Sequence, residues 1–119
     1  MSVEIEFPAD ENGFVLQNMF ERGVNLNREY DVDFVHLLPS EELAVAMAQE
    51  VDKTFSDVKI SIDQTDSGFD VYVVKMIKPT HALISKYELL YGEIANKYKG
   101  KSDGWGFQSE YNKQINQDK

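Results

Sequence analysis

The chain contains 119 residues, of which 42% are hydrophobic and 12% are aromatic, and it has no cysteine. This length predicts one domain with a single core, and the apolar content excludes a chain that is disordered throughout. The absence of cysteine excludes a disulfide framework, a thiol nucleophile and thiolate metal sites. No apolar run approaches the roughly 18 residues of a membrane span and no secretory signal is visible, so we expect a cytoplasmic protein.

The acidic charge is concentrated in the first half of the chain. Overall, 21 acidic residues oppose 12 basic ones, a net charge of −9. Residues 1–50 contain eleven acids and only two arginines, whereas residues 51–119 balance ten acids with ten lysines. This disfavours direct nucleic-acid binding, which needs a basic surface, and favours a basic protein partner. Solubility alone also explains an acidic surface.

The first half of the chain predicts a strand, a helix and a second strand. Apolar residues alternate with glutamate over residues 3–7, which is typical of a short strand. Asp10 can cap a helix with apolar residues at helical spacing up to residue 20, and Gly23 can end it. Residues 30–38 predict a strand with apolar residues on both faces, interrupted by His36 on one face and by Asp31 and Asp33 on the other.

The middle of the chain predicts a helix followed by two strands. Ser40 can cap the helix, whose apolar stripe is Ala44, Met47, Ala48, Val51 and Phe55. Residues 58–62 alternate apolar and polar side chains, which indicates a half-exposed strand. After a turn at residues 66–68, residues 69–77 are apolar on both faces and predict another strand.

The last predicted elements are a long helix and a short strand. Thr80 can cap the helix, and Gly100 can end it. Residues 104–107 can form the strand, and residues 108–119 are polar and expected to be flexible.

The order of these elements predicts an α+β fold. Two split βαβ units within residues 28–107 make a ferredoxin-like βαββαβ sandwich, an antiparallel sheet with two helices on one face. Residues 1–27 are the N-terminal strand and helix extension, so that residues 1–107 form a single domain. Because two strands are apolar on both faces, we expect the first 25 residues, or else a partner, to cover the face opposite the helices.

Signatures of catalysis are weak. His36 lies on an apolar strand face, which is typical of a structural histidine, and His81 would need a cleft and a proton-transfer partner. The chain contains no phosphate-binding glycine loop, nucleophile elbow, zinc motif or EF-hand pattern. We therefore predict a protein that is not an enzyme and that uses neither a cofactor nor a metal.

Several short motifs make the chain resemble one known family. The motifs are Phe7-Pro8-Ala9-Asp10-Glu11-Asn12-Gly13 with Val15-Leu16, Gly23, Asp33-Phe34 leading to Pro39, Met76 through Pro79-Thr80-His81-Ala82, and Ser102-Asp103-Gly104-Trp105-Gly106. In this order they resemble the RraB family, the regulators of ribonuclease E activity B, over residues 7–107. The Pro-Thr-His-Ala and Asp-Gly-Trp-Gly motifs resemble a wider branch of that family.

The resemblance implies a cytoplasmic α+β regulator that acts by binding protein. The founding member binds the C-terminal scaffold region of ribonuclease E and lowers its RNA-cleaving activity. The founding member has a long acidic C-terminal tail, whereas residues 111–119 here are nearly neutral. We expect Asp10, Glu11, His81, Asp103 and Trp105 to line one partner-binding surface, with the acids attracting a basic partner and the tryptophan anchoring it.

Two other functions stay open at this point. The chain could be a small-ligand-binding or enzymatic domain with a groove near His81, Asp103 and Trp105, since ferredoxin-like sheets host such sites. It could also be a homodimer that covers its own open sheet face and has no other partner. The RraB-like interpretation is compatible with a monomer or a weak homodimer.

Overall fold

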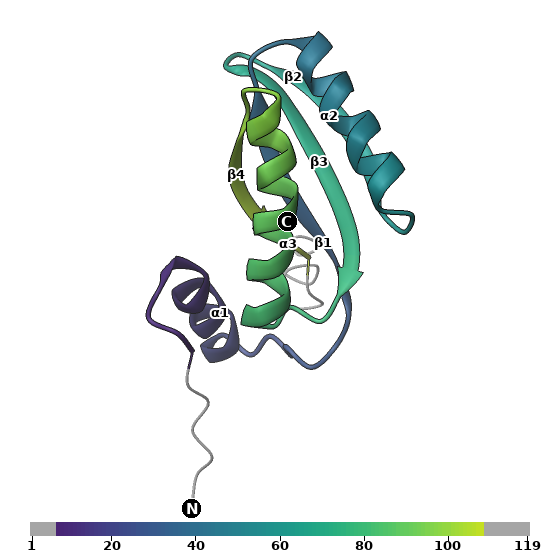
Figure 1. The fold of residues 1–119 in the computed structure, drawn as a ribbon. Coiled ribbons are helices and arrows are strands. Elements are labelled where there is room, and N and C mark those ends of the chain that lie inside the picture. Colours follow the sequence, from purple (N-terminus) through teal and green to yellow (C-terminus); the bar gives the residue numbers. More distant parts are fainter. Residues whose placement is uncertain (1–6, 109–119) are drawn as a thin grey trace, which may run out of the picture.

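The computed structural model describes residues 7–108 and shows three helices with a four-stranded antiparallel sheet (Figure 1). In chain order the elements are α1 (Glu11–Glu21), β1 (Tyr30–Leu38), α2 (Glu41–Thr54), β2 (Lys59–Thr65), β3 (Gly68–Ile77), α3 (His81–Lys97) and β4 (Lys101–Gly106). The strand order is β2-β3-β1-β4, with α2 and α3 on one face. This α+β arrangement is compatible with the predicted ferredoxin-like sandwich. No helix within residues 7–108 is long and apolar enough to cross a membrane.

The three predicted helix caps are confirmed. The side chains of Asp10, Ser40 and Thr80 each accept a hydrogen bond from the backbone N–H three residues further along. Each cap satisfies one of the N–H groups that a helix start leaves without an intrahelical partner. Local sequence therefore sets where all three helices begin.

Several elements differ from the predictions at their ends. The strand predicted over residues 58–62 is β2, which runs from Lys59 to Thr65. The long helix ends at Lys97, and β4 begins at Lys101 rather than at residue 104. Gly100 lies between them against β1, where a Cβ atom would come within 2.5 Å of Leu38 Cδ1. The predicted N-terminal strand falls on residues 1–6, outside the described residues, apart from Phe7, which is not in a strand. The predicted flexible tail also falls outside them, except for residue 108.

The core lies between the sheet and the pair α2 and α3. Tyr91 of α3 is fully buried at its centre, 5.3 Å from the ring of Phe34 and 5.1 Å from the ring of Phe55, both edge-on. The other buried core residues of these elements are Val32, Leu38, Ala44, Met47, Val51, Val71, Val73, Ile77, Ile84 and Ala95. Even-numbered residues of β1 and odd-numbered residues of β3 supply the sheet side, as the alternation predicted.

We expected the first 25 residues to cover the face of the sheet opposite α2 and α3. For residues 7–25, the described part of that segment, this expectation is wrong. Helix α1 packs against α3, beyond the end of the sandwich (Figure 1). The reason is a set of polar contacts between α1, α3 and β4. Within residues 7–108, no helix covers the face of the sheet opposite α2 and α3.

His36 is the structural histidine that the sequence predicted. Its side chain is 1% exposed on the core face of β1, and its Nδ1 lies 3.2 Å from the carbonyl oxygen of Val71. Loss of solvent lowers the pKa of His36, and the contact with Val71 opposes this shift only in part. The folded protein therefore holds a neutral imidazole in its core.

This buried imidazole predicts a pH-dependent stability. In the unfolded chain the imidazole of His36 binds a proton at its ordinary pKa near 6.5, whereas in the folded chain it does so only at a lower pH. The contribution of the neutral imidazole to the free energy of unfolding is therefore complete above pH ~6.5. It is lost as the pH falls from there through the lowered pKa. In His36→Gln, the free energy of unfolding should decline less between about pH 7.5 and about pH 5 than in the natural protein. Urea denaturation across this range measures it, and His81→Gln, which keeps His36, is the control. Equal slopes for the natural protein and His36→Gln would contradict this account.

Candidate functional site

One carboxylate joins the first turns of α1 and α3. Asp10 accepts a hydrogen bond from the backbone N–H of Gly13 at 2.8 Å, and its other oxygen lies 2.9 Å from Nε2 of His81. The Gly13 N–H and then His81 lower the pKa of Asp10. Asp10 is therefore ionised at neutral pH while it caps α1 and holds the first residue of α3.

A tight turn before α1 explains the glycine that follows Asp10. A Cβ atom at Gly13 would lie 1.8 Å from the carbonyl oxygen of Pro8. That carbonyl accepts a hydrogen bond from the backbone N–H of Asp10 at 2.9 Å. The chain therefore folds back onto the helix start at a distance that only glycine permits.

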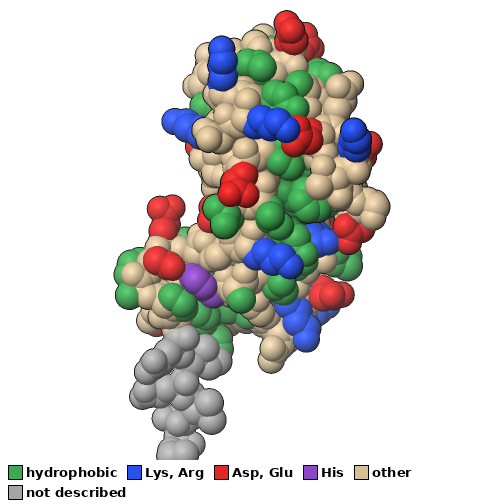
Figure 2. Space-filling view, viewed as in Figure 1, with side chains coloured by type: hydrophobic (Ala, Val, Ile, Leu, Met, Phe, Trp, Pro, Cys, Tyr) green, Lys and Arg blue, Asp and Glu red, His purple; other side chains and the backbone are tan. Residues whose placement is uncertain are grey.

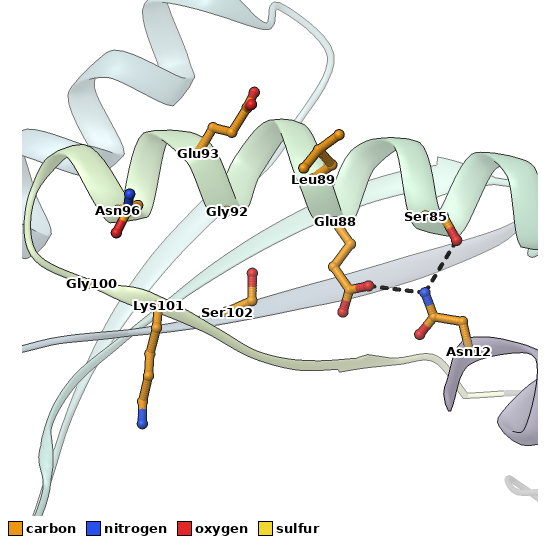
Figure 3. A pocket seen from close by; sticks show the side chains of 10 residues that line it. All are labelled: Asn12, Ser85, Glu88, Leu89, Gly92, Glu93, Asn96, Gly100, Lys101 and Ser102. Atoms are coloured by element: carbon orange, nitrogen blue, oxygen red, sulfur yellow. Dashed lines mark hydrogen bonds between the residues drawn. The ribbon is translucent and has the colours of Figure 1, made fainter. Parts of the chain in front are cut away.

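Asn12 links α1 to both other elements. Its Nδ2 donates to Oε1 of Glu88 at 2.9 Å and to Oγ of Ser85 at 3.3 Å, both on α3 (Figure 3). Its Oδ1 accepts a hydrogen bond from Nε1 of Trp105 on β4 at 2.8 Å. One amide side chain therefore satisfies an indole N–H and fixes the angle between α1 and α3.

Trp105 lies half-buried at this contact. It is paired with Phe34 across β1 and β4, and its ring stacks on Phe107 at 6.4 Å and 11°. Phe107 in turn stacks on Tyr30 at 4.6 Å. The tryptophan therefore completes the edge of the core with its ring and holds α1 with its N–H group.

We call Asp10, Asn12, His81 and Trp105 the α1 junction. The structure brings three of the predicted site residues together there, with Asp10 bonded directly to His81 and Trp105 joined through Asn12. The other two predicted residues, Glu11 and Asp103, are exposed on α1 and β4. Asn12 was not among the predicted site residues, and its one signal in the sequence is its place in the motif that runs from Phe7 to Gly13.

A groove runs between α3 and β4 and ends at Asn12 (Figure 3). Its volume is about 660 Å³, and its lining residues are Asn12, Ser85, Glu88, Leu89, Gly92, Glu93, Asn96, Gly100, Lys101 and Ser102. Leu89 is 63% exposed beside it. Lys101 points away from α3 in this view, whereas Ser85 and Glu88 point towards Asn12.

A second hollow of about 330 Å³ lies on the other side of α1. It is lined by Phe7, Pro8, Phe20, Val24, Asn25, Leu26, Asn27, Pro79, Thr80 and His81. Neither hollow is lined by Asp103 or Trp105. Of the three residues around which the alternative function expects a groove, His81 lines the second of these two hollows.

The hydrogen bonds of the α1 junction hold α1 against α3 and β4. Among the described residues the imidazole of His81 bonds only to Asp10, so no hydroxyl nucleophile is paired with it. Within residues 7–108 no three His, Asp or Glu side chains are placed to hold a metal ion. Charges of both signs are interspersed on the helix face of the molecule, with hydrophobic side chains between them (Figure 2).

Comparison with known families gives one match. The model of the family RraB, described as "Regulator of ribonuclease activity B", matches residues 9–107. A comparison with curated proteins found no match. The matched segment contains every residue of the α1 junction.

The junction predicts that Asn12→Ala loosens α1. The substitution removes two bonds to α3 and leaves the Trp105 N–H without its acceptor, which costs about 1–2 kcal/mol. Amide hydrogen exchange within α1 should therefore become about tenfold faster. Asn18→Ala, an exposed substitution in the same helix, is the matched control. Equal exchange rates in the two variants would show that Asn12 does not hold α1.

Proposed function

Because the chain belongs to the RraB family of regulators of ribonuclease activity, we propose that it binds a protein partner and lowers the RNA-cleaving activity of that partner. The partner we propose is ribonuclease E, bound through its scaffold region. The observation that carries the proposal is the family match over residues 9–107, which spans all seven helices and strands. In this proposal the chain is a cytoplasmic, ferredoxin-like binding protein without catalytic activity of its own.

The partner-binding surface in this proposal is built around the α1 junction. Asp10, His81 and Trp105 set the position of α1, and the half-buried ring of Trp105 adds an apolar contact. Glu11 on α1 and Asp103 on β4 supply exposed carboxylates. Such carboxylates raise the association rate of a basic segment more than they raise its final affinity.

The charge of the whole chain supports a basic partner. The net charge of −9 gives a field that attracts cationic segments and repels RNA. Regulation by contact with the enzyme therefore agrees better with this charge than competition for the RNA substrate does.

Calorimetric titration of the full chain against the ribonuclease E scaffold region tests the proposal. We expect a Kd in the micromolar range or below at about 50 mM salt and weaker binding at about 300 mM, because salt screens exposed charges. The same concentrations should slow cleavage of a model RNA by ribonuclease E. Absence of heat at both salt concentrations would remove ribonuclease E as the target.

A pair of variants tests the surface itself. In Glu11→Gln with Asp103→Asn, affinity should fall by about fivefold, since each exposed pair contributes well under 1 kcal/mol. Glu41→Gln with Asp66→Asn removes the same charge from a helix start and a turn elsewhere, and it should retain the affinity. An equal loss in both variants would point to net charge rather than to this surface.

A further inference from the structure

Within residues 7–108, no helix packs on the face of the sheet opposite α2 and α3. The register places the side chains of Val35, Tyr72 and Ser61 in one row across β1, β3 and β2. The neighbouring rows are Leu37, Asp70 and Asp63 on one side and Asp33, Val74 and Lys59 on the other. We call this surface the open face.

The apolar part of the open face lies on the two central strands. Val35, Leu37, Tyr72 and Val74 are half-buried without any element above them within residues 7–108, and Met76 is 58% exposed. A contiguous apolar patch of this kind on a sheet is typical of an interaction surface.

Carboxylates converge on the centre of this patch. Partial loss of solvent, and then the charges of Asp70, Asp63 and Asp33, raise the pKa of Tyr72. Loss of solvent and the neighbouring Asp31 likewise raise the pKa of Asp33. Both directions agree with the register, which places these carboxylates close together on one face of the sheet.

The described part of the chain supplies little positive charge to this surface. None of Asp31, Asp33, Asp63 and Asp70 forms an ion pair with another residue of the range 7–108. The lysines that share the open face are Lys59 and Lys101, which lie on the two edge strands. The helix face, by contrast, mixes charges of both signs (Figure 2).

We propose that the open face docks an extended arginine- and lysine-rich segment of a partner protein, with cationic groups between Asp33, Asp63 and Asp70 and over the ring of Tyr72. A guanidinium group fits this arrangement because it can bind carboxylates through paired hydrogen bonds and stack on an aromatic ring. Apolar side chains of the segment then lie on Val35 and Val74. This surface is separate from the α1 junction, and its use does not require the partner to be ribonuclease E.

The aspartates of the open face argue against a second copy of the chain or RNA as its binding partner. A second copy of the chain would bring two sets of four aspartates together, and their repulsion opposes a face-to-face dimer. RNA would bring phosphates to the same carboxylates. Helix α1 is held elsewhere by its bonds to α3 and β4.

The test is an NMR titration of the full ¹⁵N-labelled chain with a synthetic peptide of alternating arginine and valine. About ten residues, at ~3.3 Å each, suffice to cross the sheet. We expect amide shifts concentrated in β1 and β3 and none with a peptide of alternating glutamine and valine. Shifts confined to the helices would overturn the proposal.

Charge-neutralising variants give the quantitative readout. Asp33→Asn with Asp70→Asn should weaken binding of the arginine peptide by about tenfold, because the variant loses two partly exposed, solvent-screened contacts between a carboxylate and a guanidinium group. Glu42→Gln with Asp52→Asn removes the same charge from exposed positions of α2 and should change affinity by less than about twofold. Equal losses in both variants would show non-specific attraction and overturn the proposal.

Two further measurements identify a different occupant. A chain ending at residue 108 that binds the peptide about tenfold tighter than the full chain would assign the open face to residues 109–119. A dimer in sedimentation that the peptide dissociates would assign it to a second copy. Either result overturns the proposal, and neither bears on the ribonuclease E titration.

Discussion

The antiparallel pairing of β1 with β3 is the constraint on which both faces of the molecule depend. Nine residue pairs run from Tyr30 opposite Ile77 to Leu38 opposite Phe69. Because side chains alternate along a strand, this register sends Phe34 and Val73 into the core and Asp33 and Tyr72 to the open face. A shift by one residue would bury the aspartates and expose the core, so the hydrophobic effect and the cost of burying charge select the same register.

The helices use this sheet in different ways. Helices α2 and α3 bury apolar stripes against one face of the sheet. There the ring of Tyr91 contacts three other rings, those of Phe34 in β1, Tyr87 in α3 and Phe55 after α2. Helix α1 is attached through a network of side-chain hydrogen bonds centred on Asn12 and Asp10, with Leu16 as its one fully buried apolar residue. The attachment of α1 is therefore sensitive to single polar substitutions.

Six of the eleven acids in residues 1–50 lie in three places in this fold. Asp10 and Glu11 lie at the start of α1, Asp31 and Asp33 on the open face, and Glu41 and its neighbour in the first turn of α2. Those on α2 interact favourably with the helix dipole. The carboxylates at the other two places supply the charge complementarity on which our two proposed binding surfaces depend, and that complementarity gives partner selection and rapid association.

The sequence by itself determined the helix starts, the bounds of β1 and the family, because caps, alternation and short motifs act between residues close along the chain. It also identified His36 as structural, since a polar side chain on an otherwise apolar strand face must enter the core. The position of β4 could not be read in the same way, because residues 101–106 show no apolar alternation and form a strand only by pairing with β1 around a bulge.

Only the tertiary structure decided where α1 lies and which sheet face stays open. The bond between Asp10 and His81 joins residues 71 apart, and the bond between Asn12 and Trp105 joins residues 93 apart. No local pattern encodes such contacts, because their geometry follows from how the two halves of the sandwich pack. For the same reason, four aspartates that are scattered over residues 31–70 become one charged surface only when the sheet aligns them.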